Sequence, residues 1–216
     1  MYKQLLAMED NTFLVTYISP LFSEKGERTI NECFRKEMAK ADGVEISVAY
    51  CGYNSLKEMD RLVKKGNIKY ICLILGMYYF IGLQDTFYKL VMQIHTKWQK
   101  KGVGEIRLVD FFKHHDKIYC FYKDGKISST IIGSPNLSFL IKNNKNRKPR
   151  QHELGELIDK PSSLKRHKEY MEKLKSDRFS KNMTFLERYK NVVVKEEVDE
   201  KNEIVKKTKI TYTKNY

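Results

Sequence analysis

The stretch HHDKIYCFYKDGKISSTIIGSPNLSFL, residues 114–140, holds two apolar runs that are separated by a short polar segment. Asp124 and Gly125 lie in that segment, and Asp-Gly between two apolar runs is a strong signal for a β-hairpin. The sequence therefore predicts a strand over residues 115–122 and an antiparallel partner over residues 127–132.

Three polar side chains around this hairpin have the chemistry of a phosphate site. Side chains two residues apart in a strand point to the same face of a sheet, so His115 and Lys117 are expected to share a face. The turn GSPN, residues 133–136, follows the second strand and can bring Asn136 back to that face. A histidine, a lysine and an amide on one surface would hold a phosphate group beside a nucleophile.

The chain before the hairpin predicts alternating strands and helices. VEISVAY (44–50) and IKYICLIL (68–75) have the composition of buried strands, and apolar residues recur at helical spacing over residues 55–65. This strand–helix–strand order predicts parallel pairing with a right-handed crossover. Further elements are expected at residues 13–18, 29–41, 86–99 and 105–109. We therefore predict an α/β fold with a mixed sheet flanked by helices and a charged C-terminal appendage.

The chain after the hairpin is more polar. KNNKNRKPR (142–150) places five cations in nine residues without an apolar anchor, which predicts a loop. QHELGELI (151–158) predicts a short strand, and a helix is expected from about Leu164 to Leu174 after a Pro-Ser-Ser cap. We predict one domain over residues 1–160. Residues 161–216 are predicted to form a C-terminal helix followed by a charged tail that can adopt a β-ribbon.

The net charge of +14, with an isoelectric point near 9.4, favours a polyanionic partner. Cations that neutralise phosphates release counterions, which drives nucleic-acid binding. The charge therefore indicates a nucleic acid as partner. The cations expected to contact DNA are those of the polar loop: Lys142, Lys145, Arg147, Lys148 and Arg150.

Cysteine spacing and hydropathy argue against a zinc site, a disulfide scaffold and a membrane protein. The four cysteines form no CxxC pair, so we expect small core side chains in a reducing cytoplasm rather than a zinc site or a disulfide scaffold. No run of about 18 apolar residues and no signal-peptide pattern is evident, so neither a membrane span nor export is predicted. His95, within the helix expected at residues 86–99, is interpreted as structural.

His115-x-Lys117 followed by Gly133-Ser134-x-Asn136 resembles the signature of the phospholipase D superfamily. The resemblance covers about residues 44–160 and is more specific than a lone His-x-Lys, because the hairpin separates the two parts of the motif. It implies a phospholipase D-like half fold for the predicted domain 1–160. It also implies a phosphodiesterase that acts through a histidine nucleophile.

One departure from the family pattern indicates which branch of the superfamily the chain resembles. The usual family aspartate lies five positions after the lysine, where this chain has Tyr122. The chain thereby resembles the branch that contains type II restriction endonucleases, which use a histidine, a lysine, an asparagine and a later glutamate. Glu153 is favoured for the glutamate and Glu156 remains an alternative, since the two would point to opposite faces of a regular strand.

The resemblance implies catalysis without a metal or another cofactor. His115 would attack the phosphorus and form a phosphohistidine, while Lys117 and Asn136 stabilise the charged transition state. Glu153 would hold a histidine in its productive tautomer. A site of this family needs two copies of the motif and the chain has one, so the resemblance implies a homodimer with one shared site.

Other interpretations remain open at this stage. Ser134 and Ser138 are candidate phosphate ligands but could equally cap a turn. His114 is expected at the surface or facing DNA, and Asp116 on the other side of the sheet. Besides a restriction endonuclease, the candidates are a nonspecific nuclease, a phosphodiesterase acting on phospholipid, and a DNA-binding module with a decayed site. Sequence recognition could reside in loops, in the C-terminal segment or in a separate protein.

Overall fold

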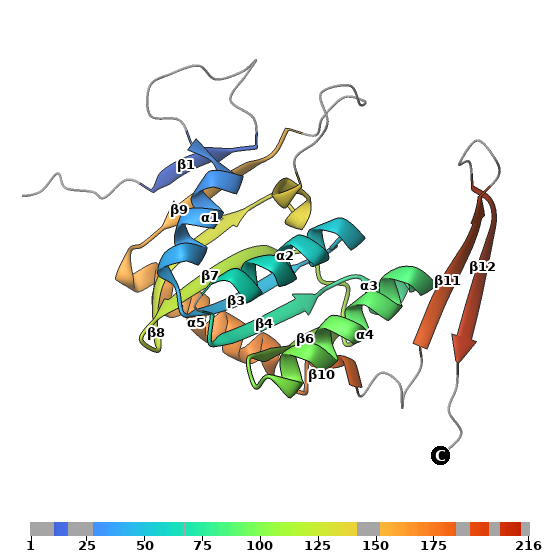
Figure 1. Cartoon of the computed structure of the whole chain (residues 1–216). Coiled ribbons are helices and arrows are strands. Elements are labelled where there is room, and N and C mark those ends of the chain that lie inside the picture. The colour runs from blue at the N-terminus through green and yellow to red at the C-terminus, as the bar shows by residue number, and fades with distance from the viewer. Residues whose placement is uncertain are drawn as a thin grey trace, which may run out of the picture.

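Nine strands form one mixed sheet in the computed structural model of the chain (Figure 1). The structure describes residues 11–16, 28–66, 68–141, 152–184, 191–198 and 204–212, and the strand count refers to these residues. In sheet order the strands are β10 (Ser180–Asn182), β6 (Gly104–Val109), β4 (Tyr70–Leu75), β3 (Gly43–Val48), β7 (Lys117–Lys123), β8 (Lys126–Gly133), β9 (Leu154–Ile158), β1 (Thr12–Val15) and β2 (Arg28–Thr29). The predicted mixed sheet is confirmed.

The predicted strand–helix–strand unit forms the middle of this sheet. β3 and β4 pair in parallel, and the helix between them is α2. β6 continues the parallel set on the far side of β4, while β7 pairs antiparallel with β3. The helices that connect or cover these strands are α1 (Ile30–Lys40), α2 (Tyr53–Lys65), α3 (Tyr78–Ile81), α4 (Asp85–Lys100), the 3₁₀ helix η1 (Leu137–Leu140) and α5 (Pro161–Lys175).

The hairpin β7–β8 turns at the predicted Asp124-Gly125 pair. Both residues have positive φ, 49° and 73°, as a two-residue turn that matches the strand twist requires. The prediction that the first strand begins at His115 was wrong, because β7 begins at Lys117. Lys117 pairs with Val48, the last residue of β3, so the ladder offers no partner to the residues before it.

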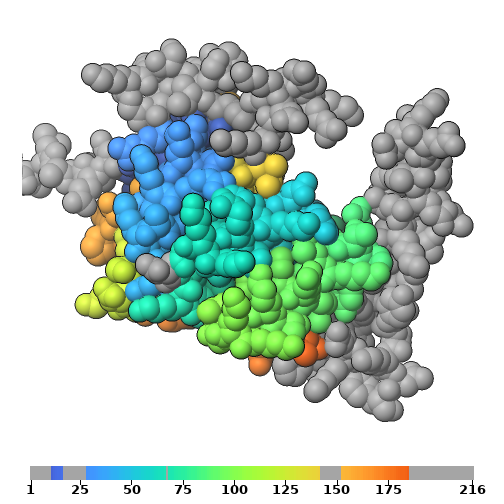
Figure 2. All heavy atoms as spheres, in the orientation of Figure 1, coloured from blue at the N-terminus to red at the C-terminus, as the bar shows by residue number. Residues whose placement is uncertain are grey.

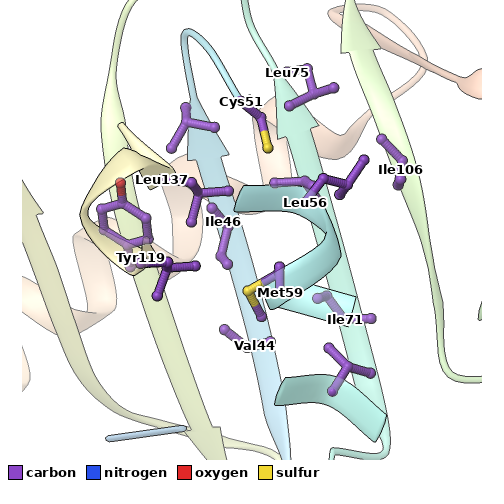
Figure 3. Close-up of a cluster of buried hydrophobic side chains, with 14 of the residues drawn as sticks. Val44, Ile46, Cys51, Leu56, Met59, Ile71, Leu75, Ile106, Tyr119 and Leu137 are labelled. Carbon is purple, nitrogen blue, oxygen red and sulfur yellow. The ribbon is translucent and has the colours of Figure 1, made fainter. Parts of the chain in front are cut away.

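Helices cover both faces of the sheet. The larger core lies between the sheet and α1, α2, α4 and η1, and it includes Ile46, Leu56 and Met59, which Figure 3 shows beside Tyr119 and Leu137. Figure 2 shows the side chains of α1, α2 and α4 closing over this face. The smaller core lies on the opposite face under α5. Successive residues of β7 alternate between the two cores, because side chains of a strand alternate in direction.

The starts of α1 and α2 and the environment of His95 in α4 can be compared with predictions from local features of the sequence. Thr29 caps α1, since its hydroxyl accepts a hydrogen bond from the Glu32 amide at 3.2 Å. α2 begins two residues earlier than predicted, after Gly52. His95 of α4 is buried and structural as predicted: its Nδ1 accepts from the Ile106 amide at 2.9 Å, and its Nε2 lies 3.0 Å from the Thr184 hydroxyl.

The C-terminal helix belongs to the packed structure. α5 buries Leu164, Met171 and Leu174 against the sheet, and β10 after it pairs with β6. The boundary predicted at residue 160 stays a prediction. Beyond β10, β11 (Asn191–Val198) and β12 (Ile204–Tyr212) form an antiparallel ribbon, and β11 also pairs in parallel with β5 (Leu83–Gln84).

All four cysteines are buried and unpaired, which confirms their prediction as core side chains. Burial raises the pKa of the Cys33 thiol to about 11 and that of the Cys72 thiol to about 12, so both are neutral at physiological pH. Within the described residues, no helix combines the length and apolar character needed to cross a membrane.

Candidate active site

The candidate site lies at one end of the sheet, where several strands begin or end together. β3 ends at Val48 opposite the first residue of β7, and the end of β8 lies opposite the start of β9. Loops that follow or precede these strands therefore meet at this end. They bring together five of the predicted residues, which come from three segments: His115, Lys117, Ser134, Asn136 and Glu153.

His115 and Lys117 are in direct contact. Lys117 Nζ lies 2.7 Å from His115 Nδ1 and 3.4 Å from Nε2, and it also donates to the His115 carbonyl oxygen at 2.7 Å. The imidazole is exposed, whereas Lys117 is buried to 8% exposure. Burial lowers the pKa of Lys117, and the carboxylates of Glu153 and Asp116 oppose that shift. A cation thus lies under a solvent-accessible imidazole.

The Asn136 amide is held in a fixed orientation. The Tyr119 hydroxyl, two residues along β7 from Lys117, donates to the Pro135 carbonyl at 2.5 Å and so anchors the turn. The Tyr50 amide donates to Asn136 Oδ1 at 2.9 Å, which leaves the NH₂ group of Asn136 for a ligand. The Tyr50 ring also meets the His115 ring edge to face at 6.0 Å. Tyr50 therefore connects the asparagine with the histidine.

The structure separates the two candidate glutamates. Glu153 is 8% exposed and interacts electrostatically with Lys117. Its backbone is tied to Thr16 by three hydrogen bonds, at 3.0, 3.1 and 3.5 Å. Burial raises the pKa of Glu153, and the charge of Lys117 acts against this shift. Glu156 is exposed and accepts from Asn11 at 3.1 Å. Of the two, Glu153 shares the environment of the His-Lys pair.

The two serines differ in their surroundings. The Ser134 hydroxyl accepts from the Leu154 amide at 3.1 Å, and the Ser134 amide donates to the Leu154 carbonyl at 2.9 Å. Ser134 thus joins the end of β8 to the start of β9 beside the site, which is a structural role. Ser138 lies exposed on η1 and is absent from the lining of the cleft described below.

His114 was expected at the surface, and that prediction was wrong. It is 2% exposed, and its Nε2 lies 2.6 Å from the Ser47 hydroxyl on β3. Burial lowers its pKa. The Asp116 carboxylate accepts a hydrogen bond from Tyr170 on α5, but Asp116 lines the same cleft as His115 and Lys117, so the sheet does not separate it from them as predicted. The residues on either side of His115 are therefore both anchored.

A cleft of about 410 Å³ opens beside His115 and Lys117. Its other wall is α5, which contributes His167 and Tyr170, two residues that the sequence did not single out. The lining residues are His115, Asp116, Lys117, Ile118, Ile132, Gly133, Ser134, His167 and Tyr170. The site thus extends from the motif to the C-terminal helix.

The five cations proposed for DNA contact, residues 142–150, lie outside the described residues. Among the described residues, no group of three or more histidine, cysteine, aspartate or glutamate side chains is arranged to hold a metal ion.

Comparison with known sequences identifies the family. The sequence model of the N-terminal phospholipase D (PLD) domain of NgoFVII restriction endonuclease matches residues 28–188. The chain belongs to this PLD domain family. The resemblance drawn from the His-x-Lys and Gly-Ser-x-Asn segments is thereby confirmed, and the chain is a PLD-superfamily nuclease, a hydrolase of phosphodiester bonds. The matched region includes α5 and β10.

Solved structures similar to this PLD domain are distant in sequence. NucT from Helicobacter pylori is 14% identical, with a TM-score of 0.45 over 66% of this chain and 84% of NucT. A variant of yeast tyrosyl-DNA phosphodiesterase is 14% identical, with a TM-score of 0.39 over 68% of this chain and 46% of the yeast chain. No curated protein sequence matches. The family assignment therefore rests on the sequence match.

Proposed function

We propose that this PLD domain is a metal-independent DNA endonuclease of the type II restriction class, with His115 as the nucleophile. The observation that carries the proposal is the contact of Lys117 Nζ with His115 Nδ1, at 2.7 Å, in a member of a restriction endonuclease family. The exposed imidazole can be reached by a phosphate, and the buried ammonium beneath it offsets the negative charge of that phosphate.

The first step forms a bond from an imidazole nitrogen of His115 to phosphorus and breaks the bond from phosphorus to the leaving sugar oxygen. Lys117 and the NH₂ group of Asn136 donate to the non-bridging oxygens, on which negative charge increases in the transition state. The product is a phosphohistidine and a free strand end. Water then attacks the phosphorus, and the nitrogen–phosphorus bond breaks to release the enzyme.

The contact between Lys117 and His115 defines the resting state in this proposal. An ammonium has donors only, so Lys117 engages the lone pair of the imidazole that it touches. The nucleophile becomes available when oxygens of a bound phosphate replace the imidazole as acceptors of Lys117. Glu153, which interacts with Lys117, holds the ammonium on this side of the ring and supports the histidine in its productive tautomer.

Both steps need a proton carrier that one copy of the motif does not supply. The leaving oxygen must receive a proton, and the attacking water must lose one. A second copy of the chain supplies its own motif histidine for both transfers, so the active species is a homodimer with a shared site on the two-fold axis. A shared site cleaves the two strands of double-stranded DNA one after the other.

The charge of the chain favours DNA over a lipid. The net charge of +14 fits a polyanion, and the Lys142–Arg150 loop would flank the site in sequence between Asn136 and Glu153. Ser134 and Ser138 remain candidates for contacts with neighbouring phosphates. The alternative functions are a nonspecific PLD-like nuclease and a DNA-binding module with a decayed site; a separate or C-terminal element would supply sequence recognition.

Plasmid cleavage in EDTA tests the proposal, with His115→Ala as the paired variant. We expect cleavage by the wild-type chain in EDTA, no cleavage by the variant, and equal melting temperatures for the two. Discrete fragments indicate a restriction enzyme, whereas a smear indicates a nonspecific nuclease. End-labelled DNA trapped during turnover should give a protein adduct that resists alkali and is released by acid, as expected for a phosphorus–nitrogen bond. Cleavage abolished by EDTA, or retained in His115→Ala, would contradict the mechanism.

Subunit mixing tests the shared site. When wild-type protein exchanges subunits with an excess of His115→Ala, each mixed dimer has one motif histidine instead of two. We expect activity to fall below the fraction of wild-type chains present. Activity proportional to that fraction, together with a monomer in sedimentation of the active enzyme, contradicts a homodimer.

A further inference from the structure

The cleft between the sheet and α5 has a lining that suits a group larger and less charged than phosphate. Ile118 and Ile132 contribute apolar side chains to the lining, and Tyr170 contributes an aromatic ring from α5. The Asp116 carboxylate lies in the same lining and would repel a second phosphate. Ser134 and His167 add polar groups to the lining. A lining that combines apolar side chains, an aromatic ring and a few polar groups is typical of a pocket for a small organic ring system.

His167 carries a second indication of a ligand. Its Nδ1 is buried and has no hydrogen-bond partner within the part of the chain that the structure describes. A buried polar atom without a partner costs stability, so such atoms are found where a ligand or an unseen water completes the site. Burial lowers the pKa of His167, which favours the neutral imidazole with one donor and one acceptor. A nucleobase edge presents the complementary pairs of groups.

We propose that this cleft is a subsite for the nucleoside that adjoins the scissile phosphate, with the base stacked against Tyr170 and its edge hydrogen-bonded to His167. The inference rests on the proposed function, because His115 and Lys117 line the same cleft and would hold the phosphate to which that nucleoside is attached. The Asp116 carboxylate accepts from the Tyr170 hydroxyl and fixes the ring in place. A base in the cleft has left its stack, so a nucleoside that is unpaired enters at lower cost.

Imidazole NMR signals can test the subsite without relying on catalysis. The chain has five histidines, so the spectrum of their ring nitrogens is simple. Titration with deoxythymidine 3′,5′-bisphosphate should shift the signals of His115 and His167, whereas inorganic phosphate should shift that of His115 alone. His95 of α4 is buried, with its Nδ1 hydrogen-bonded to the Ile106 amide, and serves as the internal control.

The outcomes separate the two proposals. A His167 signal that stays constant while His115 shifts overturns the subsite and leaves the phosphate site intact. Equal shifts of His167 with inorganic phosphate show an anion site instead and also overturn the nucleoside. A His115 signal that neither probe moves contradicts the phosphate site itself, and with it the proposed function.

Kinetics on a mapped oligonucleotide substrate provide the second test. Loss of one base stack is worth about tenfold in affinity, so Tyr170→Ala should raise KM about tenfold while Tyr170→Phe, which keeps the ring, stays close to wild type. The matched control is Lys168→Gln, on the flank of the same helix that faces a different surface hollow. Removing the base beside the cut should reduce the cost of Tyr170→Ala to nothing. A Tyr170→Ala variant with unchanged KM and an intact fold overturns the stacking role.

Discussion

Gly76 stands where the site is most sensitive to an added atom, and Gly76→Ala should disable cleavage. The residue follows β4 and packs directly against His114. A Cβ at this position would lie 2.1 Å from the His114 carbonyl oxygen and 2.8 Å from its ring Cδ2. Ordinary contact begins at 3.4 Å, so the His114 carbonyl must retreat by about 1.3 Å. That carbonyl belongs to the peptide bond that leads into His115.

The expected loss can be estimated from this displacement. A shift of about 1 Å in a reacting group costs about 10²-fold in rate, because the attack geometry is lost. Crowding the buried His114 should also cost about 1–3 kcal/mol of stability, as overpacking of a core does. We therefore expect the single-turnover rate of plasmid nicking to fall about 10²-fold while the chain remains folded at 25 °C.

Gly52→Ala is the matched control. Gly52 follows β3 at the same end of the sheet, but a Cβ there meets nothing closer than Ser55 Oγ at 3.8 Å. We expect its nicking rate to stay within about twofold of wild type, with a stability change below about 1 kcal/mol in urea unfolding. If Gly76→Ala cuts at the wild-type rate, His114 does not position the nucleophile.

Three further substitutions test single contacts. Glu153→Gln removes a carboxyl group whose pKa is raised by burial. Such a carboxyl group stabilises the fold fully below its unfolded pKa, and this stabilisation decreases as the pH rises. Denaturation measured across pH should therefore show the wild type losing stability relative to the variant above about pH 4.5. Asn136→Asp keeps an acceptor for the Tyr50 amide but brings a negative charge to the phosphate, so stability should hold in urea while nicking falls at least about 10²-fold; nicking near the wild-type rate would exclude the phosphate contact. Tyr122→Phe leaves the buried Glu45 carboxylate without its 2.6 Å donor and should cost about 1–3 kcal/mol in urea with an unchanged nicking rate; a matching loss of activity would place Tyr122 in the site.

Local signals were sufficient for most of the fold. The hairpin follows from Asp124-Gly125, and the parallel unit follows from two apolar strands with an amphipathic helix between them. The start of β7 could not be found in this way, since it depends on where β3 ends, which is a pairing between residues about 70 positions apart in sequence. The end of a strand is set by the strand that it pairs with, and that strand can be distant in the sequence.

The site was predictable to the extent that a motif records it. His115, Lys117 and Asn136 follow from the pattern, and Tyr50 could have been added because ligands in open α/β sheets bind at the carboxyl ends of parallel strands. The contribution of α5 had no such signal. Tyr170 reaches Asp116 across 54 positions, and nothing in the sequence of either segment indicates that contact.

Position 122 shows why the missing family aspartate does not argue for a decayed site. Tyr122 follows Lys117 by five residues, about 16 Å along an extended strand, and an odd offset directs it to the opposite face. There it packs in the core under α5 and donates to Glu45, which also pairs with Lys175. The residue thus ties β7 to β3 near the end of β7 that lies away from His115. A tyrosine in place of an aspartate alters this buried network, whose members Glu45 and Lys175 are not among the proposed site residues, so under the proposed function it is no sign of a decayed site.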